Sequence, residues 1–281
     1  MPRYDQLRVQ AEAGGLLFEG DPQTRSRVDF DVTYDLGEAP KASLVVYNPP
    51  EGFASRVRRG SFVRVAAGWD GALGAVFAGT PAVDGVEISD TKADMTVTVK
   101  IVPGAEAWRK AISVGGRGQV SYEAAVRACI SDMGLRVGVL DLSGAPTYLP
   151  RAAHFEGPGW RRLHTYARSA GAEVAFDGET VSILRPHVGV PPGRAEVPYF
   201  AQDNGAGALI GTPKHTDKGL TFETFFDTRI RLGHRVGLDY YDKFAGQNVR
   251  GVYTIRALQH TGSSHGDART TRATARFVGG L

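Results

Sequence analysis

The stretch that decides the fold is Arg-Val-Arg-Arg-Gly-Ser-Phe-Val-Arg-Val at residues 56–65, because it returns as Arg-Ile-Arg-Leu-Gly-His-Arg-Val-Gly-Leu at residues 229–238. Both copies place a β-branched residue between two arginines, then a glycine, then further apolar alternation. The similarity continues downstream, where Ala-Val-Phe-Ala-Gly at 75–79 matches Gly-Val-Tyr-Thr-Ile at 251–255 after a longer loop. A repeat so widely spaced predicts two copies of one β-rich domain with an insert between them. A chain that carries the same surface twice is suited to quasi-equivalent contacts, which favours assembly over chemistry.

Composition is that of a folded protein. The chain has 281 residues, of which 42% are hydrophobic, and its 36 glycines are typical of many hairpins and bulges. The 33 basic and 30 acidic residues leave a net charge of +3, which is too small for a nucleic-acid-binding field. The single cysteine, Cys129, excludes an internal disulfide framework and fits a reducing compartment.

The sequence shows no signal for export or membrane insertion. The start of the chain lacks the apolar core of a signal peptide, and no run approaches the eighteen or so apolar residues of a spanning helix. We therefore expect a soluble product made in the cytoplasm, without membrane anchoring.

Local patterns divide the chain into three parts: a first tube-like β domain over 1–102, a small α+β insert over 103–187, and a second tube-like β domain over 188–281 that begins with a linker at 188–208. The predicted fold class is mainly β with an α+β insert, in which two antiparallel β-barrels flank the insert. Strands are predicted in the second β domain at 220–226, 229–238, 251–260 and 270–278. The insert is predicted to hold helices at 121–133 and 160–170 and a hairpin at 173–184 that turns at Asp177-Gly178.

Three phrases, in order, resemble the baseplate hub (tail hub) proteins of tailed bacteriophages. The first phrase has matching positions at Leu44 to Asn48, Gly60, Val63, Val65, Ala67, Gly68, Trp69, Phe77 and Gly79. The second is Leu-Ile-Gly-Thr-Pro at 209–213 with Gly-Leu-Thr-Phe at 219–222. The third is Gly-Val-Tyr-Thr-Ile at 251–255 with His-Thr-Gly at 260–262 and His-Gly-Asp at 265–267. Trp69 departs from the tyrosine more frequent in the family, and the insert matches only in kind.

The resemblance implies a homotrimeric virion protein of the tail baseplate. Two tube-like domains in each of three chains would form six wall segments around a channel, and this ring would join a sixfold tail tube to a threefold central spike. The implied partners are the chain itself, the tail tube protein and the central spike protein, with tape measure and baseplate wedge proteins as further neighbours. DNA would pass through the channel without specific binding.

Residue patterns for chemistry favour structural explanations. His260, His265 and Asp267 lie close together, but around Thr-Gly-Ser-Ser at 261–264 they are more typical of a hairpin loop than of a metal site, with Asp267 capping a loop amide. Cys129 lies on the apolar face of its predicted helix, as a buried structural thiol does. Gly-Pro-Gly at 157–159 lacks the Lys-Ser/Thr of a phosphate loop, which favours a plain helix N-terminus. We expect no catalytic, cofactor or metal site.

The arginines of the repeat are the candidate interface residues. On strands, Arg56 and Arg58 would share a face opposite Val57, and Arg229 and Arg231 would flank Ile230 in the same way. Three interpretations stay open: a solvated outer face, contact with acidic groups of neighbouring subunits, for which arginine is suited, or a DNA-facing role. A channel wall should not grip phosphate, so we expect these side chains to lie away from the lumen. The full set is Arg56, Arg58, Arg59, Arg64, Arg229, Arg231 and Arg235.

Other residues are expected to define the fold by permitting tight turns or bulges, namely Asn48, Gly60, Gly79, Gly211, Pro213, Gly233, Gly251 and Gly262. Two alternative functions stay open. A tail-associated cell-wall hydrolase would need paired carboxylates in one cleft, and the acidic residues are scattered. A carbohydrate-binding β module would need exposed aromatics, for which Tyr240-Tyr241 is the one candidate cluster, although it is expected in the longer loop of the second repeat.

Overall fold

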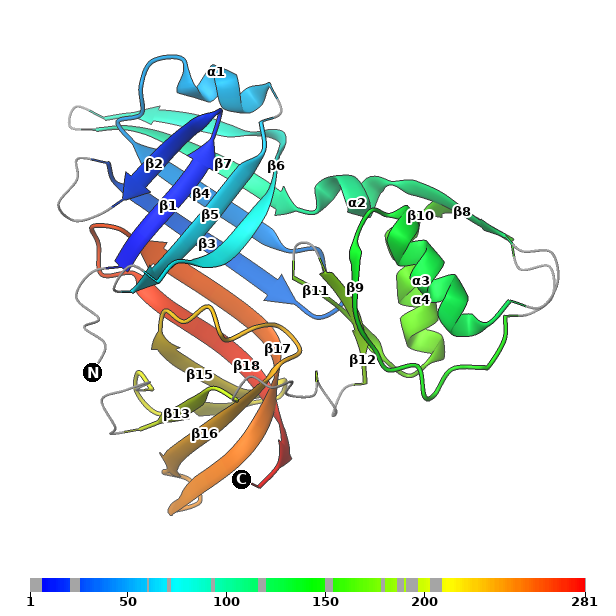
Figure 1. Cartoon of the computed structure of the whole chain (residues 1–281). Coiled ribbons are helices and arrows are strands. Elements are labelled where there is room, and N and C mark those ends of the chain that lie inside the picture. Colours follow the sequence, from blue (N-terminus) through cyan, green and yellow to red (C-terminus); the bar gives the residue numbers. More distant parts are fainter. Residues whose placement is uncertain are drawn as a thin grey trace.

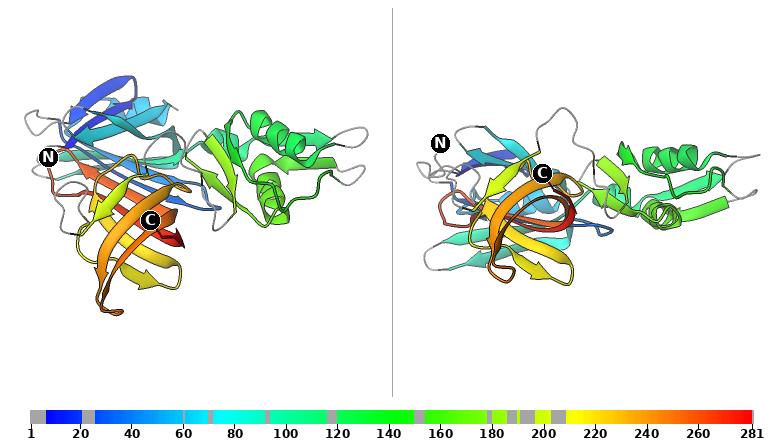
Figure 2. Two further views of the ribbon diagram at one scale, coloured as in Figure 1. Left: turned by 60° about the horizontal axis from the view of Figure 1, so that its bottom comes forward. Right: turned by 90° about the horizontal axis from the view of Figure 1, so that it is seen from below.

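The structure is a computed structural model. It describes residues 7–20, 26–59, 61–69, 72–91, 94–115, 120–149, 154–177, 180–185, 190, 197–202 and 209–280. These residues form a large antiparallel assembly of strands, with an α+β insert projecting to one side (Figures 1 and 2). The protein is therefore mainly β with an α+β insert, as the sequence predicts.

The first β-rich part, called half one here, forms from alternating apolar segments. In β3, for example, every second side chain from Val28 to Tyr34 is buried, which is the period expected of a sheet with one face on a core. A short helix, α1, lies between β4 and β5 over one end of the sheet (Figure 1). The elements of half one are β1 (Leu7–Ala13), β2 (Leu16–Gly20), β3 (Val28–Asp35), β4 (Lys41–Tyr47), α1 (Phe53–Arg58), β5 (Val63–Trp69), β6 (Gly74–Asp90) and β7 (Met95–Pro103).

The second β-rich part, half two, repeats this plan. In half one the strands are hydrogen-bonded in the order β3-β4-β7-β6-β5-β1, and in half two in the order β14-β15-β18-β17-β16-β13. Each strand of one list occupies the same position along the chain as its partner in the other list, with β2 as an extra strand. The elements of half two are β13 (Tyr199–Ala201), β14 (Lys214–Thr216), β15 (Gly219–Phe225), β16 (Arg235–Asp242), β17 (Gln247–Ser263) and β18 (Arg269–Gly279).

One pairing differs between the halves. β1 runs antiparallel to β5, whereas β13 runs parallel to β16. Within the described residues, no hydrogen-bonded pair joins β1 to β3 or β13 to β14, so the predicted barrels are not seen to close. β13 also lies inside the segment 188–208, where a linker or long loop was expected.

The insert folds around its own apolar cluster. α3 is capped by Ser121, whose hydroxyl accepts a hydrogen bond from the amide of Ala124, and α3 packs against α4 through Val126, Cys129 and Leu163. Both helices match the predicted ranges within a residue or two. The elements of the insert are α2 (Ala105–Arg109), β8 (Ala111–Gly115), α3 (Tyr122–Asp132), β9 (Arg136–Leu140), β10 (His154–Pro158), α4 (Gly159–Ser169), β11 (Glu173–Phe176) and β12 (Thr180–Leu184).

Candidate assembly surfaces

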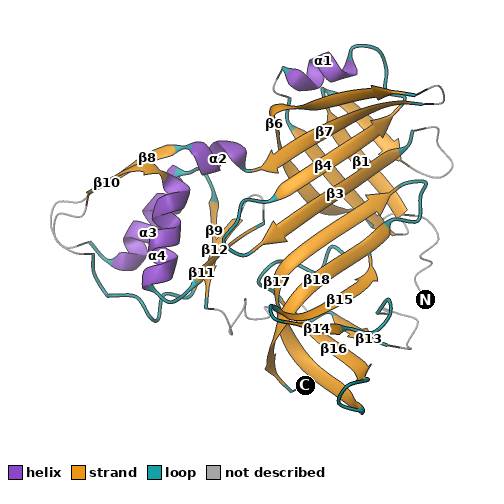
Figure 3. Cartoon of the chain, turned by 180° about the vertical axis from the view of Figure 1, so that it is seen from behind, coloured by secondary structure: helices purple, strands orange, loops and turns teal. Residues whose placement is uncertain are grey.

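The two halves meet where β3 of half one pairs with β17 of half two. Asp29–Asp35 run antiparallel to Ala257–Ser263, so one sheet continues from half one into half two (Figure 3). We call this pairing the seam. It joins strands that are more than two hundred residues apart in the sequence.

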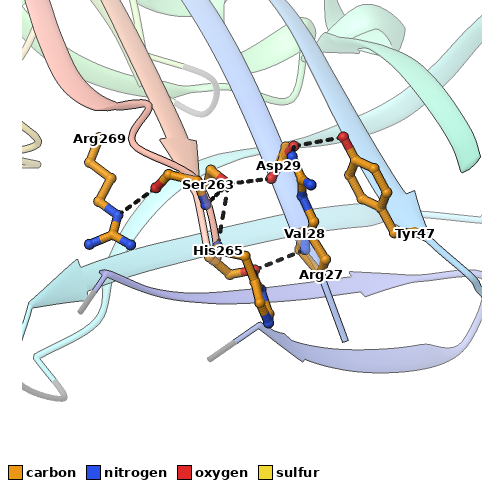
Figure 4. Close-up of polar contacts among 9 residues, drawn as sticks. Arg27, Val28, Asp29, Tyr47, Ser263, His265 and Arg269 are labelled. Atoms are coloured by element: carbon orange, nitrogen blue, oxygen red, sulfur yellow. Dashed lines mark hydrogen bonds and ion pairs between the residues drawn. The ribbon is translucent and has the colours of Figure 1, made fainter. Parts of the chain in front are cut away.

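Two carboxylates of β3 bind the polar side of the seam. Asp29 accepts hydrogen bonds from the Ser263 hydroxyl at 2.6 Å, from the Tyr47 hydroxyl at 3.0 Å and from the Arg27 guanidinium at 3.1 Å (Figure 4). Asp31 accepts from the Gln259 side-chain amide at 2.7 Å and from the Thr261 hydroxyl at 3.0 Å. Hydrogen bonds to ionised groups are the stronger ones, so these contacts fix the register of the seam.

Ser263 also organises the turn that follows β17. Its hydroxyl oxygen accepts from the amides of Gly266 at 2.7 Å and His265 at 3.3 Å, while the next hydroxyl, of Ser264, accepts from the amide of Val28 at 3.0 Å (Figure 4). The capping role expected for Asp267 is thus performed by Ser263. Residues 261–263 belong to β17, and the turn begins at Ser264.

The apolar side of the seam is filled by Phe226, the residue after β15. Its ring packs edge to face on Phe30 of half one at 5.6 Å and lies 5.4 Å from the imidazole of His260. His260 is the last residue of the predicted strand 251–260 and lies in β17, which continues through the expected loop residues to Ser263. It is buried, and its Nδ1 lies 2.8 Å from the Thr271 hydroxyl. Burial disfavours the imidazolium and lowers the pKa of His260 to about 4.

The β5–β6 hairpin of half one contributes a further contact with half two. The indole Nε1 of Trp69 donates to the carbonyl of Phe226 at 2.7 Å. A Cβ on Gly74 would fall 2.3 Å from Oγ1 of Thr228, so the hairpin lies directly against the turn after β15. The aromatic that the sequence marks as a departure from the family pattern therefore binds the other half.

The insert touches both halves near the end of the seam. Glu173 of β11 forms an ion pair with Arg256 of β17, and the amide of Gly37, after β3, donates to the carbonyl of Val174 at 2.8 Å. Gly233 has a left-handed backbone with φ of 76°, and a Cβ there would fall 2.4 Å from Leu184 of the insert.

A cavity of about 400 Å³ opens where half one, half two and the insert converge. Its lining includes the guanidinium-bearing side chains of Arg64, Arg136 and Arg231, together with Asp177 and Tyr34. The Tyr34 hydroxyl is already bonded to the carbonyl of Val76 at 2.8 Å.

The repeated phrase does not form strands where we expected them. Arg56 and Arg58 lie in α1, and Arg59 caps its C-terminus. Residues 229–234 form turns, and β16 begins only at Arg235 instead of at Arg229. The inside-outside pattern nevertheless holds in both copies, because Val57 and Ile230 are fully buried between exposed arginines.

The arginines of the candidate set make mainly local contacts. Arg58 donates to the carbonyl of Val86, and Arg59 to that of Ser55. Arg229 forms a bidentate pair with Asp227, with contacts of 2.7 to 3.1 Å. Arg64 lies over the ring of Phe62 at 6.0 Å. All but the half-buried Arg235 have exposed side chains, so these arginines are accessible to another subunit. Their role as an interface stays a proposal.

The predicted fold-defining residues occupy turns and close approaches. Asn48 adopts a left-handed backbone with φ of 48°, and its side chain bonds to Asp94 and to the amide of Met95. A Cβ on Gly262 would fall 2.3 Å from the ring of Phe30, which places the seam backbone directly on that ring. A Cβ on Gly79 or Gly251 would likewise fall under 3 Å from a neighbouring atom. Gly211 has a positive φ and Pro213 is buried. Gly60 lies outside the described residues.

Chemical groups elsewhere are held in structural environments. Burial raises the pKa of the Cys129 thiol to about 12, so it is not a nucleophile at neutral pH. Tyr240 and Tyr241 lie in β16 and not in a loop, and Tyr240 is buried. Among the described residues there is no group of three His, Cys, Asp or Glu side chains that could hold a metal ion, and no helix long and apolar enough to cross a membrane.

Sequence reasoning missed the residues that make the seam. The alternation Val-Asp-Phe-Asp-Val at 28–32 placed Asp29 and Asp31 on one face of a strand, and this was the available signal. Nothing in the sequence connected that face with Gln259, Thr261 and Ser263, because strand pairing between distant segments has no local signature.

Comparison with known proteins rests on structure. No family model matches the chain. No curated protein matches it in sequence either. The fold is similar to that of the tail protein from Neisseria meningitidis MC58, with a TM-score of 0.62, 11% identity and 96% of both chains covered.

Two other solved structures agree with this match. The 43 kDa tail protein of prophage MuSo2 from Shewanella oneidensis has a TM-score of 0.57 and 10% identity, over 96% of this chain and 98% of that one. The third structure is the E. coli c3393 protein, a component of the type VI secretion system that is structurally similar to the T4 bacteriophage tail proteins gp27 and gp5. It has a TM-score of 0.57 and 12% identity, over 92% of this chain and 77% of that one. The chain therefore has the fold of phage tail proteins.

Proposed function

We propose that this chain is a structural virion protein, the trimeric hub of a tail baseplate. In this role it joins the sixfold tail tube to the threefold central spike and lines the channel through which DNA passes. The observation that carries the proposal is the matched strand order of the two halves within a fold shared with tail proteins.

The repeat explains how one ring serves two symmetries. Three chains with two similar halves each present six similar lobes to a sixfold tube, while the inserts repeat only three times and match a threefold spike. Head-to-tail contacts that close into a ring are the arrangement such an assembly requires. The work is geometric and needs no catalysis.

Charge supports passage of DNA without retention. The net charge of the whole chain is +3, and each phosphate neutralised by a basic side chain would add affinity. Tube and spike proteins are the proposed partners, with tape measure and wedge proteins beside them, and the tail baseplate is the proposed location.

Single-particle electron microscopy of the purified chain, alone and with the candidate spike and tube proteins, tests the proposal. A ring of three chains with six wall lobes is the expected result. Monomers in every mixture would refute the hub assignment, and hydrolysis of purified peptidoglycan would favour the hydrolase instead.

A further inference from the structure

The contact between the two halves has a counterpart that is unused within one chain. By strand order, the β5–β6 hairpin of half one corresponds to the β16–β17 hairpin of half two. The turn after β15, at 226–228, likewise corresponds to the turn after β4, at 48–50. The first hairpin lies on the turn after β15, through Trp69 and Gly74.

The tip of the β16–β17 hairpin carries Phe244, whose side chain is 99% exposed. Asp242 bonds to the backbone of the tip: its carboxylate accepts from the amides of Phe244 at 2.8 Å and Ala245 at 3.1 Å and lies 3.0 Å from Nε2 of His215. One exposed aromatic is ordinary on a protein surface. What distinguishes Phe244 is its position. It lies at the tip of the β16–β17 hairpin, and the corresponding tip of the β5–β6 hairpin is the part of half one that contacts half two.

The corresponding acceptor in half one is a preformed turn with apolar surface. Asn48 ties the turn to the β6–β7 connection, with 2.7 Å to Asp94 and 2.9 Å to the amide of Met95. Pro50 is left exposed, and a proline ring is a good partner for an aromatic face. Exposed Glu51 beside Pro50 is opposite in charge to exposed Lys243 beside Phe244.

A second feature of half one corresponds to the seam. The outer part of β17 pairs with β18 on one edge and with β3 on the other. In the described residues, the outer part of β6 from Val86 to Asp90 pairs with one strand, β7, and α1 lies beside it, with Arg58 donating to the carbonyl of Val86. Val83 and Ile88 of β6 are 77% and 52% exposed, so this end of half one, which α1 covers in part (Figure 1), presents apolar surface to another chain.

We propose that the Phe244 tip of one copy docks on the 48–50 turn of a second copy, near the exposed Val83 and Ile88 of its β6. This head-to-tail contact repeats between chains the contact that the two halves make within a chain. The proposal rests on the proposed function for its trimeric closure, but the docking itself is tested separately.

The first experiment compares Phe244→Ser with Leu17→Ser, which likewise replaces an exposed apolar side chain with serine, on β2. Association of each purified chain is measured by sedimentation over a range of concentrations. Phe244→Ser should weaken association about thirtyfold, the loss expected for a central interface aromatic, while Leu17→Ser should not. Thermal unfolding of each variant confirms that it is folded.

The second experiment does not depend on a loss of binding. A chain with Ala245→Cys, an exposed position beside Phe244 that leaves the aromatic in place, is mixed with a Pro50→Cys chain and treated with a short bismaleimide, to which buried Cys129 is inert. The mixture should give a covalent dimer, whereas each variant alone, and Leu17→Cys mixed with Pro50→Cys, should not. The double variant should give a ladder that stops at three copies.

The outcomes separate the two proposals. A trimer that is insensitive to Phe244→Ser and gives no cross-link overturns the docking and leaves the hub function standing. A ladder that continues past three copies keeps the docking and overturns the trimeric hub. A chain that neither associates nor cross-links, even at high concentration and with the spike present, overturns both.

Discussion

Replacing Phe226 with alanine should destabilise the protein more than any change of similar size at the surface. The side chain is 1% exposed, and it belongs to half two while its ring packs on Phe30 of half one and on His260. Removing a buried phenylalanine costs the transfer free energy of the ring plus that of the cavity left behind, about 3–5 kcal/mol. For a chain of this size, the thermal midpoint should fall on the order of 10 °C.

The adjacent residue supplies a matched control. Phe225 is the same residue type one position earlier, and because side chains alternate along a strand it points to the opposite face of β15, where it is 36% exposed. Phe225→Ala should cost less than about 1 kcal/mol. The backbone carbonyl of Phe226, which accepts from Trp69, remains in both variants.

Urea unfolding and differential scanning calorimetry of the wild type and both variants measure the two costs. Equal losses for Phe225→Ala and Phe226→Ala would refute the view that Phe226 fills the space between the halves. Hydrogen exchange adds a local test, since Phe226→Ala should raise exchange along the paired β3 and β17 amides before it does so in the insert.

Three further predictions concern single groups. Burial lowers the pKa of His260 to about 4 from an ordinary value near 6.5, so between those pH values the unfolded chain binds a proton that the folded chain does not. The contribution of His260 to stability should therefore be full above about pH 6.5 and fall as the pH drops toward 4. Urea melts at several pH values should show a flatter profile for His260→Gln. Cys129, whose pKa burial raises to about 12, should resist a thiol reagent in the folded protein and react fully in guanidinium; rapid labelling of the folded chain would contradict its placement. Ser263→Ala removes a donor to Asp29 and an acceptor for two amides, so it should cost about 1–3 kcal/mol in unfolding measurements, whereas exposed Ser143→Ala should cost less than about 1 kcal/mol.

Long periodic segments were predictable from the sequence. β15, β17, β18, α3 and α4 lie close to their expected ranges, because each has enough residues for a period of two or of 3.6 to be distinguished. α1 was missed because Arg-Val-Arg has one apolar residue between two charges, which suits a strand and one turn of a helix equally well. Six residues are too few to decide between those periods.

The candidate site was predictable only in part. The repeated phrase identified corresponding segments of the two halves, and the burial of Val57 and Ile230 shows that the apolar residue between arginines keeps its place in both. The seam could not be predicted from the sequence, because Asp29 and Ser263 are joined by a pairing of strands that lie far apart in the chain. Phe244 was missed because full exposure of an aromatic is a property of the folded hairpin and has no signature in composition.

The proposed ring has six lobes but threefold symmetry, and the insert gives a physical reason for the difference. Within a chain, the seam is braced by the insert, through the Glu173–Arg256 ion pair and the bond from the Gly37 amide to the carbonyl of Val174. Each chain has two halves but one insert, so in the proposed ring braced seams within chains alternate with unbraced docking contacts between chains. The unbraced contacts should open first on dilution, and dissociation into folded monomers should therefore precede unfolding. Arg256→Ala should lower the unfolding midpoint of the monomer while leaving the association constant unchanged, and a change in association of the same size as that of Phe244→Ser would contradict the distinction between the two kinds of contact.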